Sequence, residues 1–195
     1  MTDTTAAALA RPDDERRAHD LPSVAHRTVD SPVGPLLLAA TPAGLVRIAF
    51  GREDHDLVLD RLLGEVGRFG QVGGADRRTE RSPRRLDEAA RQLDAYFTGR
   101  RRTFDLPLDL RLAHGFRRTV LTHLRDVVYG TTTTYAALAA RTGRPGAGRA
   151  VGSACATNPL PVVVPCHRVV RSDGVVGEYL GGTEAKRALL ALEAA

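Results

Sequence analysis

The sequence predicts an α+β fold, with a small N-terminal antiparallel sheet with helices, followed by a mostly helical C-terminal domain that contains a helix-turn-helix. Three observations support this prediction. Short apolar segments separated by turn signals occupy residues 27–50, which is typical of strands. Apolar residues then recur at helical spacing. In the second half of the chain, two helical segments flank a short turn that contains glycine.

The bulk composition is that of a globular chain. Its 195 residues are 43% hydrophobic, which is enough to bury the core of one domain or two small ones. Pro, Gly and Arg interrupt every apolar run, so none approaches the ~18 to 20 residues of a membrane-spanning helix. The first 20 residues lack a signal-peptide pattern. We therefore expect a cytoplasmic protein with no membrane partner.

The net charge and the cysteine content give limited information about partners and bound groups. The net charge of +5 permits attraction to a polyanion but is weak evidence by itself. The only cysteines are Cys155 and Cys166, and neither a metal-ligand spacing nor a disulfide framework surrounds them. We expect reduced thiols, no metal site and no cofactor.

The N-terminal half is interpreted as a structural α+β domain over residues 25–110, preceded by a mobile leader over residues 1–24. The expected strands are 27–29, 36–39 and 45–50, with turns at 31–34 and 41–44. Helical spacing over 59–66 and 86–97 predicts two helices that cover this sheet. No set of residues in this half indicates a catalytic or binding site, so we expect its role to be structural.

The C-terminal domain is expected over residues 111–195 and is predicted to be mostly helical. Apolar spacing from Phe116 to Val127 predicts one helix that Gly130 closes. Thr133 or Thr134 can cap a short second helix. The remaining expected elements are a turn at 142–145, a helix over 146–156 stopped by Asn158-Pro159, a short buried strand at 162–164, and an amphipathic helix over 183–193.

The densest chemical signal is Pro165-Cys166-His167-Arg168, where a thiol lies beside an imidazole after an apolar run. A thiolate is the reactive form of cysteine, and a nearby base can lower the pKa of the thiol. On these residues alone, a small buried structural cysteine is the favoured interpretation. The glycines between residues 143 and 152 do not match a dinucleotide-binding loop, because their spacing differs and a helix precedes them.

The order of motifs resembles the C-terminal domain of O6-alkylguanine-DNA alkyltransferases. The resemblance covers about 80 residues, from about Phe116 to Glu193. It is carried by Val128-Tyr129-Gly130, Thr134-Tyr135, Arg149-Ala150-Val151-Gly152, Asn158-Pro159, Pro165-Cys166-His167-Arg168-Val169-Val170 and the segment from Gly177 to Gly182. Residues 26–110 resemble the N-terminal domain of the family more loosely, best at residues 104–108.

This resemblance implies DNA repair by irreversible, stoichiometric alkyl transfer to Cys166. His167 resembles the base, acting through a water, and Glu193 resembles the residue that orients its imidazole. Tyr135 resembles the general acid that protonates the departing guanine, and without the resemblance it is equally well a core tyrosine. Asn158 resembles the residue that braces the turn before the cysteine.

The resemblance also implies that the partner is double-stranded DNA containing O6-alkylguanine, bound by a monomer. Arg149 resembles the arginine that fills the stack when the damaged nucleotide flips out. The other expected DNA contacts are Thr134, Tyr135, Ala150 and Gly152, and the expected substrate pocket consists of Pro161, Val169, Gly177, Tyr179 and Leu180. The sequence leaves open whether O4-alkylthymine is also a substrate.

Several positions depart from the family pattern. Ala156 and Thr157 stand where a basic residue or glycine is common, so one phosphate contact is expected to be missing. Leu121 replaces a frequent tryptophan, Arg117 a frequent glutamine, and Leu180 a smaller residue at the pocket rim.

Two other functions are compatible with parts of the sequence. A lesion-binding protein that does not accept the alkyl group is the alternative, but Cys166 argues against it. A sequence-specific transcription factor would need several base-reading polar side chains on residues 146–156, and this segment is poor in them.

Overall fold

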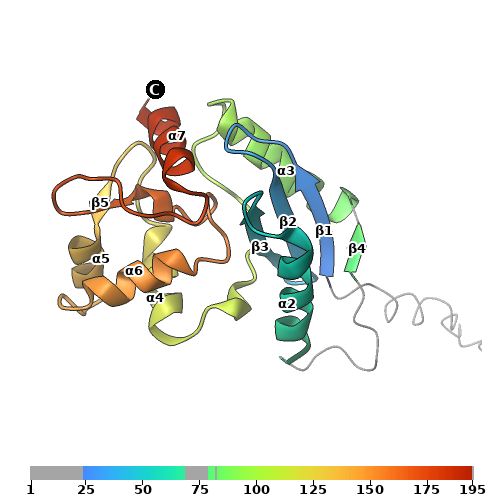
Figure 1. Cartoon of the computed structure of the whole chain (residues 1–195), viewed down its shortest axis with the longest axis horizontal. Coiled ribbons are helices and arrows are strands. Elements are labelled where there is room, and N and C mark those ends of the chain that lie inside the picture. The colour runs from blue at the N-terminus through green and yellow to red at the C-terminus, as the bar shows by residue number, and fades with distance from the viewer. Residues whose placement is uncertain (1–23, 69–78, 82, 195) are drawn as a thin grey trace, which may run out of the picture.

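The structure of the chain, a computed structural model, describes residues 24–68, 79–81 and 83–194. Figure 1 shows a sheet with α2 and α3 in one half of the molecule, and α4 to α7 in the other. In chain order the elements are β1 (Val24–Val29), β2 (Leu36–Thr41), β3 (Gly44–Phe50), α2 (His55–Arg68), β4 (Thr79–Arg81), α3 (Pro83–Phe97), the 3₁₀ helix η1 (Leu110–Leu112), α4 (Gly115–Leu124), β5 (Thr133–Thr134), α5 (Tyr135–Arg141), α6 (Gly148–Ala156), the 3₁₀ helix η2 (Cys166–Arg168), β6 (Val169–Val170) and α7 (Thr183–Ala194).

The α+β fold class is confirmed, and the three expected strands form an antiparallel meander. The strand order in the sheet is β3-β2-β1-β4, and β4, which the sequence pattern did not predict, pairs with β1 in parallel. The expected leader lies outside the described residues except for Val24, which is fully buried as the first residue of β1.

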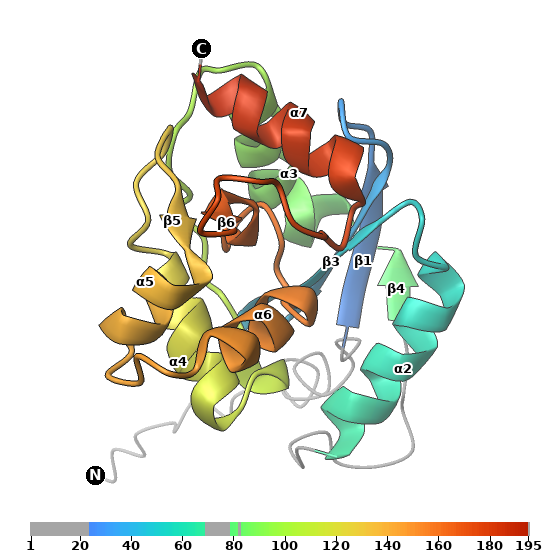
Figure 2. The ribbon, with the colours of Figure 1, turned by 60° about the vertical axis from the view of Figure 1, so that its left-hand side comes forward.

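The two helices of the N-terminal half cover opposite faces of this sheet (Figure 2). Leu62 and Val66 of α2 pack in a small cluster with Val24, Ala39 and Val46. The α3 side chains Leu86, Ala89 and Leu93 belong to a different and larger cluster, together with Leu36, Leu38 and Ile48 of the sheet. Because both faces are covered, every residue of β2 is buried.

In the C-terminal half, the helices on either side of the expected turn are present. The Thr134 side chain caps α5 by accepting a hydrogen bond from the backbone N–H of Ala137 at 3.1 Å. Helix α4 is shorter than expected, because the chain turns after Leu124, although Val127 stays buried beyond its end. Leu121 of α4 is fully buried. None of the helices in the described residues is long and apolar enough to cross a membrane.

The strand expected at residues 162–164 is wrong, because the chain turns there instead. Val162 has a φ of 72°, a left-handed conformation that interrupts an extended strand. The Asn158 side chain occupies the backbone groups that a neighbouring strand would use. Its Oδ1 accepts from the N–H of Leu160 at 3.0 Å and its Nδ2 donates to the carbonyl of Val164 at 2.8 Å. The short strand β6 follows the cysteine and pairs in parallel with β5.

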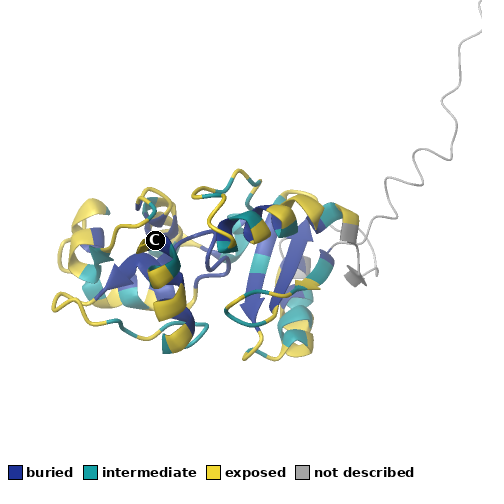
Figure 3. Ribbon diagram, turned by 90° about the horizontal axis from the view of Figure 1, so that it is seen from above, coloured by how far each residue is buried: buried dark blue, intermediate teal, exposed yellow. Residues whose placement is uncertain are grey.

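One apolar core continues from the sheet into the C-terminal helices. The larger cluster joins strand residues such as Ile48 and Phe50 to Leu160, Val164 and Leu189. The backbone N–H of Ile48 also donates to the carbonyl of Pro159 at 2.8 Å. Figure 3 shows buried chain in both halves of the molecule. The core therefore fixes the turn that precedes Cys166 against the edge of the sheet.

Candidate active site

Cys166 opens the 3₁₀ helix η2 and is almost fully buried, with 2% of its surface exposed. Its Sγ accepts a hydrogen bond from Asn158 Nδ2 at 3.1 Å. Burial raises the pKa of the thiol to about 11, while the Asn158 hydrogen bond and the Lys186 charge act in the opposite direction. The resting group is therefore a thiol, and it needs a base to become a nucleophile.

Asn158 holds the sulfur and the turn at the same time. It is fully buried, and its three hydrogen bonds go to Leu160, Val164 and the Cys166 sulfur. Because the amide is held at both ends, Nδ2 is aimed at Sγ before any substrate arrives. The brace expected from the sequence at Asn158 is present as a contact.

His167 is fully buried, and its ring is oriented by Glu193. The ring Nε2 lies 2.9 Å from Glu193 Oε1. Since a carboxylate only accepts, this contact assigns the hydrogen to Nε2 and leaves Nδ1 as the basic nitrogen. Nδ1 is buried and has no hydrogen-bond partner among the described residues. Burial lowers the pKa of His167 below its ordinary 6.5, so the imidazole is neutral at neutral pH.

Glu193 of α7 is the centre of this network. Its Oε1 accepts from Tyr96 Oη at 2.6 Å and from Arg168 at 2.8 Å, in addition to His167. Its Oε2 accepts from Arg168 Nε at 2.8 Å and from the N–H of Gly130 at 3.3 Å. Burial alone would raise the pKa of Glu193, but the hydrogen bonds from His167 and Arg168 hold it well below its ordinary value.

The sequence patterns assign no role to three buried residues around this site, namely Tyr96, Arg168 and Lys186. Arg168 was part of the cysteine motif, yet its bidentate pairing with Glu193 spans 25 positions along the chain. Lys186, the only lysine, is buried and donates to the carbonyl of Val169 at 2.6 Å. The sequence pattern places Tyr96 on the apolar face of a predicted helix and indicates nothing more. Periodicity identified its burial, but no pattern in the sequence pointed to its distant partner.

A cavity of about 720 Å³ gives access to Cys166. Six of the residues predicted from the sequence line it, namely Tyr135, Gly152, Cys166, Gly177, Tyr179 and Leu180, together with Ser153, Cys155, Ala156, Arg171 and Glu178. Pro161 and Val169, expected in the substrate pocket, are buried and are not among the lining residues. Pro161 lies in the turn before Cys166, and Val169 lies in β6 after it.

Tyr135 and Gly152 lie next to each other in the wall of this cavity. A Cβ on Gly152 would lie 3.9 Å from the Tyr135 ring, and one on Gly177 would lie 3.2 Å from the Tyr135 hydroxyl. The glycine at position 177 therefore leaves room for the phenol, whereas the contact at Gly152 has an ordinary van der Waals length. Burial raises the pKa of Tyr135, which keeps it protonated and able to donate.

The remaining expected DNA contacts lie outside the cavity. Arg149 and Ala150 are exposed at the start of α6, the helix that carries Gly152 to the cavity wall. Thr134 is partly buried as the cap of α5. Ala156 and Thr157, two of the departures from the family pattern, are exposed at the other end of α6.

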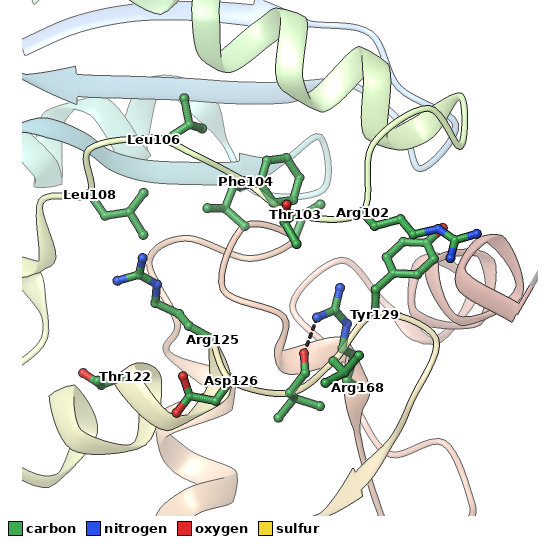
Figure 4. Close-up of a pocket in the computed structure, with 14 residues that line it drawn as sticks. Arg102, Thr103, Phe104, Leu106, Leu108, Thr122, Arg125, Asp126, Tyr129 and Arg168 are labelled. Atoms are coloured by element: carbon green, nitrogen blue, oxygen red, sulfur yellow. Dashed lines mark hydrogen bonds between the residues drawn. The ribbon is translucent and has the colours of Figure 1, made fainter.

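A second cleft has a volume of about 670 Å³, and Figure 4 shows residues that line it. It separates residues 102–108 from the segment Val127, Val128 and Tyr129, and Arg168 forms part of its wall. Arg168 Nη1 donates to the Val127 carbonyl at 2.5 Å across this wall. None of the residues expected in the substrate pocket lines this cleft. Three of those five residues, Gly177, Tyr179 and Leu180, instead line the cavity at Cys166. No group of three or more His, Cys, Asp or Glu side chains in the described ranges is arranged to hold a metal ion.

Family models match both halves of the chain. The model of the DNA binding domain of 6-O-methylguanine DNA methyltransferase matches residues 115–195. The model of its ribonuclease-like domain matches residues 24–110.

Individual relatives match over similar lengths. The methylated-DNA–protein-cysteine methyltransferase of Mycolicibacterium paratuberculosis is 38% identical over 170 residues, which cover 87% of this chain and 92% of the relative. The protein of the same name from Mus musculus is 40% identical, over 86% of this chain and 80% of the relative. The crystal structure of Mycobacterium tuberculosis OGT in complex with DNA aligns with a TM-score of 0.73 at 36% identity, over 87% of this chain and 92% of that chain.

Proposed function

The chain belongs to the family of methylated-DNA–protein-cysteine methyltransferases, and from this premise we propose that it repairs double-stranded DNA by transferring the alkyl group of O6-alkylguanine irreversibly to Cys166. The observation that carries the proposal is the position of Cys166. Its sulfur lies in a cavity wall, accepts a hydrogen bond from Asn158, and precedes a buried histidine that Glu193 orients. These groups are a nucleophile, a base and an orienting carboxylate.

The proposed reaction is an in-line displacement at the alkyl carbon. The proton of the Cys166 thiol passes through a water to Nδ1 of His167, and Glu193 stabilises the resulting imidazolium. The sulfur then forms a bond to the alkyl carbon while the bond from that carbon to O6 breaks, and the electron pair stays on the guanine. Tyr135 donates a proton to the departing base. A thioether does not hydrolyse, so each molecule reacts once.

The position of α6 supports a proposal for how DNA reaches Cys166. We propose that α5 and α6 act as a helix-turn-helix and that the damaged nucleotide leaves the stack to enter the cavity. Arg149 would then fill the gap in the duplex, because it is exposed on the helix that also carries Gly152 to the cavity. We further propose that the protein acts as a monomer in the cytoplasm, where thiols such as those of Cys155 and Cys166 stay reduced.

Analysis of the DNA product tests this function. A duplex with one O6-methylguanine is incubated with excess protein, and its nucleosides are then quantified. We expect guanine to be restored by the wild type and by Cys155→Ser, the matched control whose cysteine lines the same cavity. Cys166→Ser should bind the duplex and restore nothing. Restoration by Cys166→Ser would reject Cys166 as the acceptor, and tight binding without restoration by the wild type would favour the lesion-binding alternative.

A further inference from the structure

A side chain from the N-terminal half reaches the centre of the proposed catalytic network. Tyr96 of α3 donates its phenolic hydrogen to Glu193 Oε1 at 2.6 Å, and its oxygen lies 3.5 Å from His167 Nε2. We propose that Tyr96 is a positioning residue for alkyl transfer, whose hydroxyl shares the carboxylate oxygen that holds His167 and limits how strongly that carboxylate stabilises the imidazolium. This inference rests on the proposed function, because it assigns His167 as the base.

The hydroxyl is held as a donor in one orientation. Tyr96 is fully buried, and its ring contacts the rings of Phe97, Phe104 and Tyr129 at centroid distances of 5.4, 5.2 and 6.0 Å. Burial and the neighbouring Glu193 carboxylate raise the pKa of the phenol, so it stays protonated over the working range of pH. A protonated phenol that lies 2.6 Å from a carboxylate oxygen is a strong donor.

The direction in which the Tyr96 hydroxyl shifts the pKa of His167 follows from the donors that share Glu193 Oε1. Tyr96 and Arg168 both donate to the oxygen that also accepts from His167. Each additional donor withdraws charge from the carboxylate and makes it a weaker partner for an imidazolium. Without the Tyr96 hydroxyl, Glu193 would favour protonated His167 more strongly, and the pKa of His167 would rise. Since the base must be neutral to accept the thiol proton, the wild-type hydroxyl keeps His167 competent at lower pH.

The other charged groups around His167 do not change in this comparison. Arg168 on η2 and Lys186 on α7 face it as cations, and both lower its pKa. The neighbouring thiol of Cys166 and the phenol of Tyr179, whose ring lies 6.3 Å away, complete the titratable surroundings. Tyr96 is the contribution of α3, and its removal leaves the other groups in place.

Tyr96→Phe is the direct test, because it removes only the oxygen. The pKa of the His167 imidazole is measured by NMR titration of the full chain without DNA, with the resonance assigned from the spectrum of His167→Gln. The rate of transfer from free O6-benzylguanine is measured over the same range of pH, so that DNA binding does not enter. We expect the pKa and the acid limb of the rate profile to move up by about one pH unit. On the acid limb the rate should then fall about tenfold, with a smaller change above it.

Tyr129→Phe is the matched control. This tyrosine also contacts α7, but its hydroxyl donates to the Leu192 carbonyl at 3.2 Å and not to the carboxylate. We expect Tyr129→Phe to change the melting temperature without moving either titration. Replacement of Tyr96 by 3-fluorotyrosine, a stronger donor of nearly the same shape, should move both titrations to lower pH.

These outcomes separate the inference from the function on which it rests. Unchanged titrations in Tyr96→Phe and in the fluorinated protein would overturn the role of Tyr96, as would equal shifts in Tyr129→Phe. If Tyr96→Phe does not fold, the fluorinated protein decides alone. If the wild type restores no guanine in a duplex with O6-methylguanine while the imidazole titration still responds to Tyr96, the proposed function fails and the electrostatic coupling stands.

Discussion

The buried polar side chains of the two halves of the chain have different roles. Among the described residues, the buried polar side chains of the N-terminal half are Thr41, Gln92 and Asp109, and those of the C-terminal half are Asn158, His167, Arg168, Lys186 and Glu193. Gln92 exchanges two hydrogen bonds of 2.9 Å with the backbone of Asp105, and thereby ties a loop to a helix. In the C-terminal half, Asn158 and Lys186 also bond backbone atoms, but His167, Arg168 and Glu193 bond one another in a network beside the thiol of Cys166.

This difference indicates where function lies in the molecule. A buried polar side chain that bonds backbone atoms supplies hydrogen-bond partners that the buried backbone needs, and so it stabilises the fold. A buried cluster of titratable groups is costly, and such clusters are typical of active sites. Tyr96 is the exception that joins the two halves, since it belongs to the N-terminal fold and donates to the C-terminal network.

The largest expected effect comes from breaking the buried charge network. Glu193→Gln should lower the free energy of unfolding by about 3 to 5 kcal/mol, because Arg168 would stay buried without its counter-charge. Since the pKa of Glu193 is lowered, this contribution is present above its ordinary pKa of 4.5 and is lost as the pH falls toward the lowered value. Denaturant unfolding at pH 7 measures the loss. The control is Asp87→Asn, which breaks the exposed pair with Arg27 and should cost at most about 1 kcal/mol. Equal losses would remove the distinction between the halves.

A smaller effect is expected where the sheet contacts the loop that contains Tyr179 and Gly181. A Cβ on Gly181 would lie 2.7 to 2.9 Å from ring atoms of Phe50, which is buried at the end of β3. Phe50 also contacts Tyr179 of the cavity wall edge-on, at 5.4 Å between ring centroids. Gly181→Ala should therefore cost about 1 to 3 kcal/mol of stability and weaken the reaction with O6-benzylguanine. Combining it with Phe50→Leu should recover part of both losses, and strictly additive losses would argue against this contact.

Next in size is the effect of Arg149 on repair in duplex DNA. Arg149→Ala should slow repair of a duplex about tenfold and leave the reaction with free O6-benzylguanine nearly unchanged, because only the duplex requires nucleotide flipping. Single-turnover rates with the two substrates measure the difference. Arg100→Ala, at an exposed arginine of the N-terminal half, should change neither rate. Equal slowing of both reactions by Arg149→Ala would place its role in folding or chemistry.

The smallest expected effect concerns the salt dependence of DNA binding. Ala156→Arg should steepen the plot of log affinity against log salt by about 0.9, the value of one added phosphate contact. A matched arginine in the N-terminal half, Thr98→Arg, should leave the slope unchanged, since Thr98 is exposed after the end of α3 and none of the proposed DNA contacts lies in that half. Binding titrations at several salt concentrations decide the matter. An unchanged slope for Ala156→Arg would exclude position 156 from the phosphate interface.

Local sequence signals predicted the parts of the site that depend on neighbours in the chain. The Thr134 cap, the Asn158-Pro159 stop and the adjacent Cys166 and His167 are visible in short windows. The error at residues 162–164 arose because an apolar β-branched run favours a strand locally, while the Asn158 side chain stabilises a turn there.

Long-range partnerships could not be predicted from the same patterns. Tyr96 and Glu193 are 97 positions apart, and each lies on a helix whose periodicity explains its burial without naming its partner. The strand β4 has only three residues, which is too short for a periodic signal. The network around Glu193 is thus a product of the packing of α3 against the C-terminal half, which no local window contains.

The mass of the intact protein after reaction tests the central claim most directly. The full chain is incubated with an excess of duplex DNA containing O6-methylguanine, and its mass and peptide map are then recorded. We predict the gain of one methyl group per molecule, located on the peptide that contains Cys166, with no further gain at longer times. A methyl group on Cys155, more than one methyl group per molecule, or repaired DNA with protein of unchanged mass would contradict it.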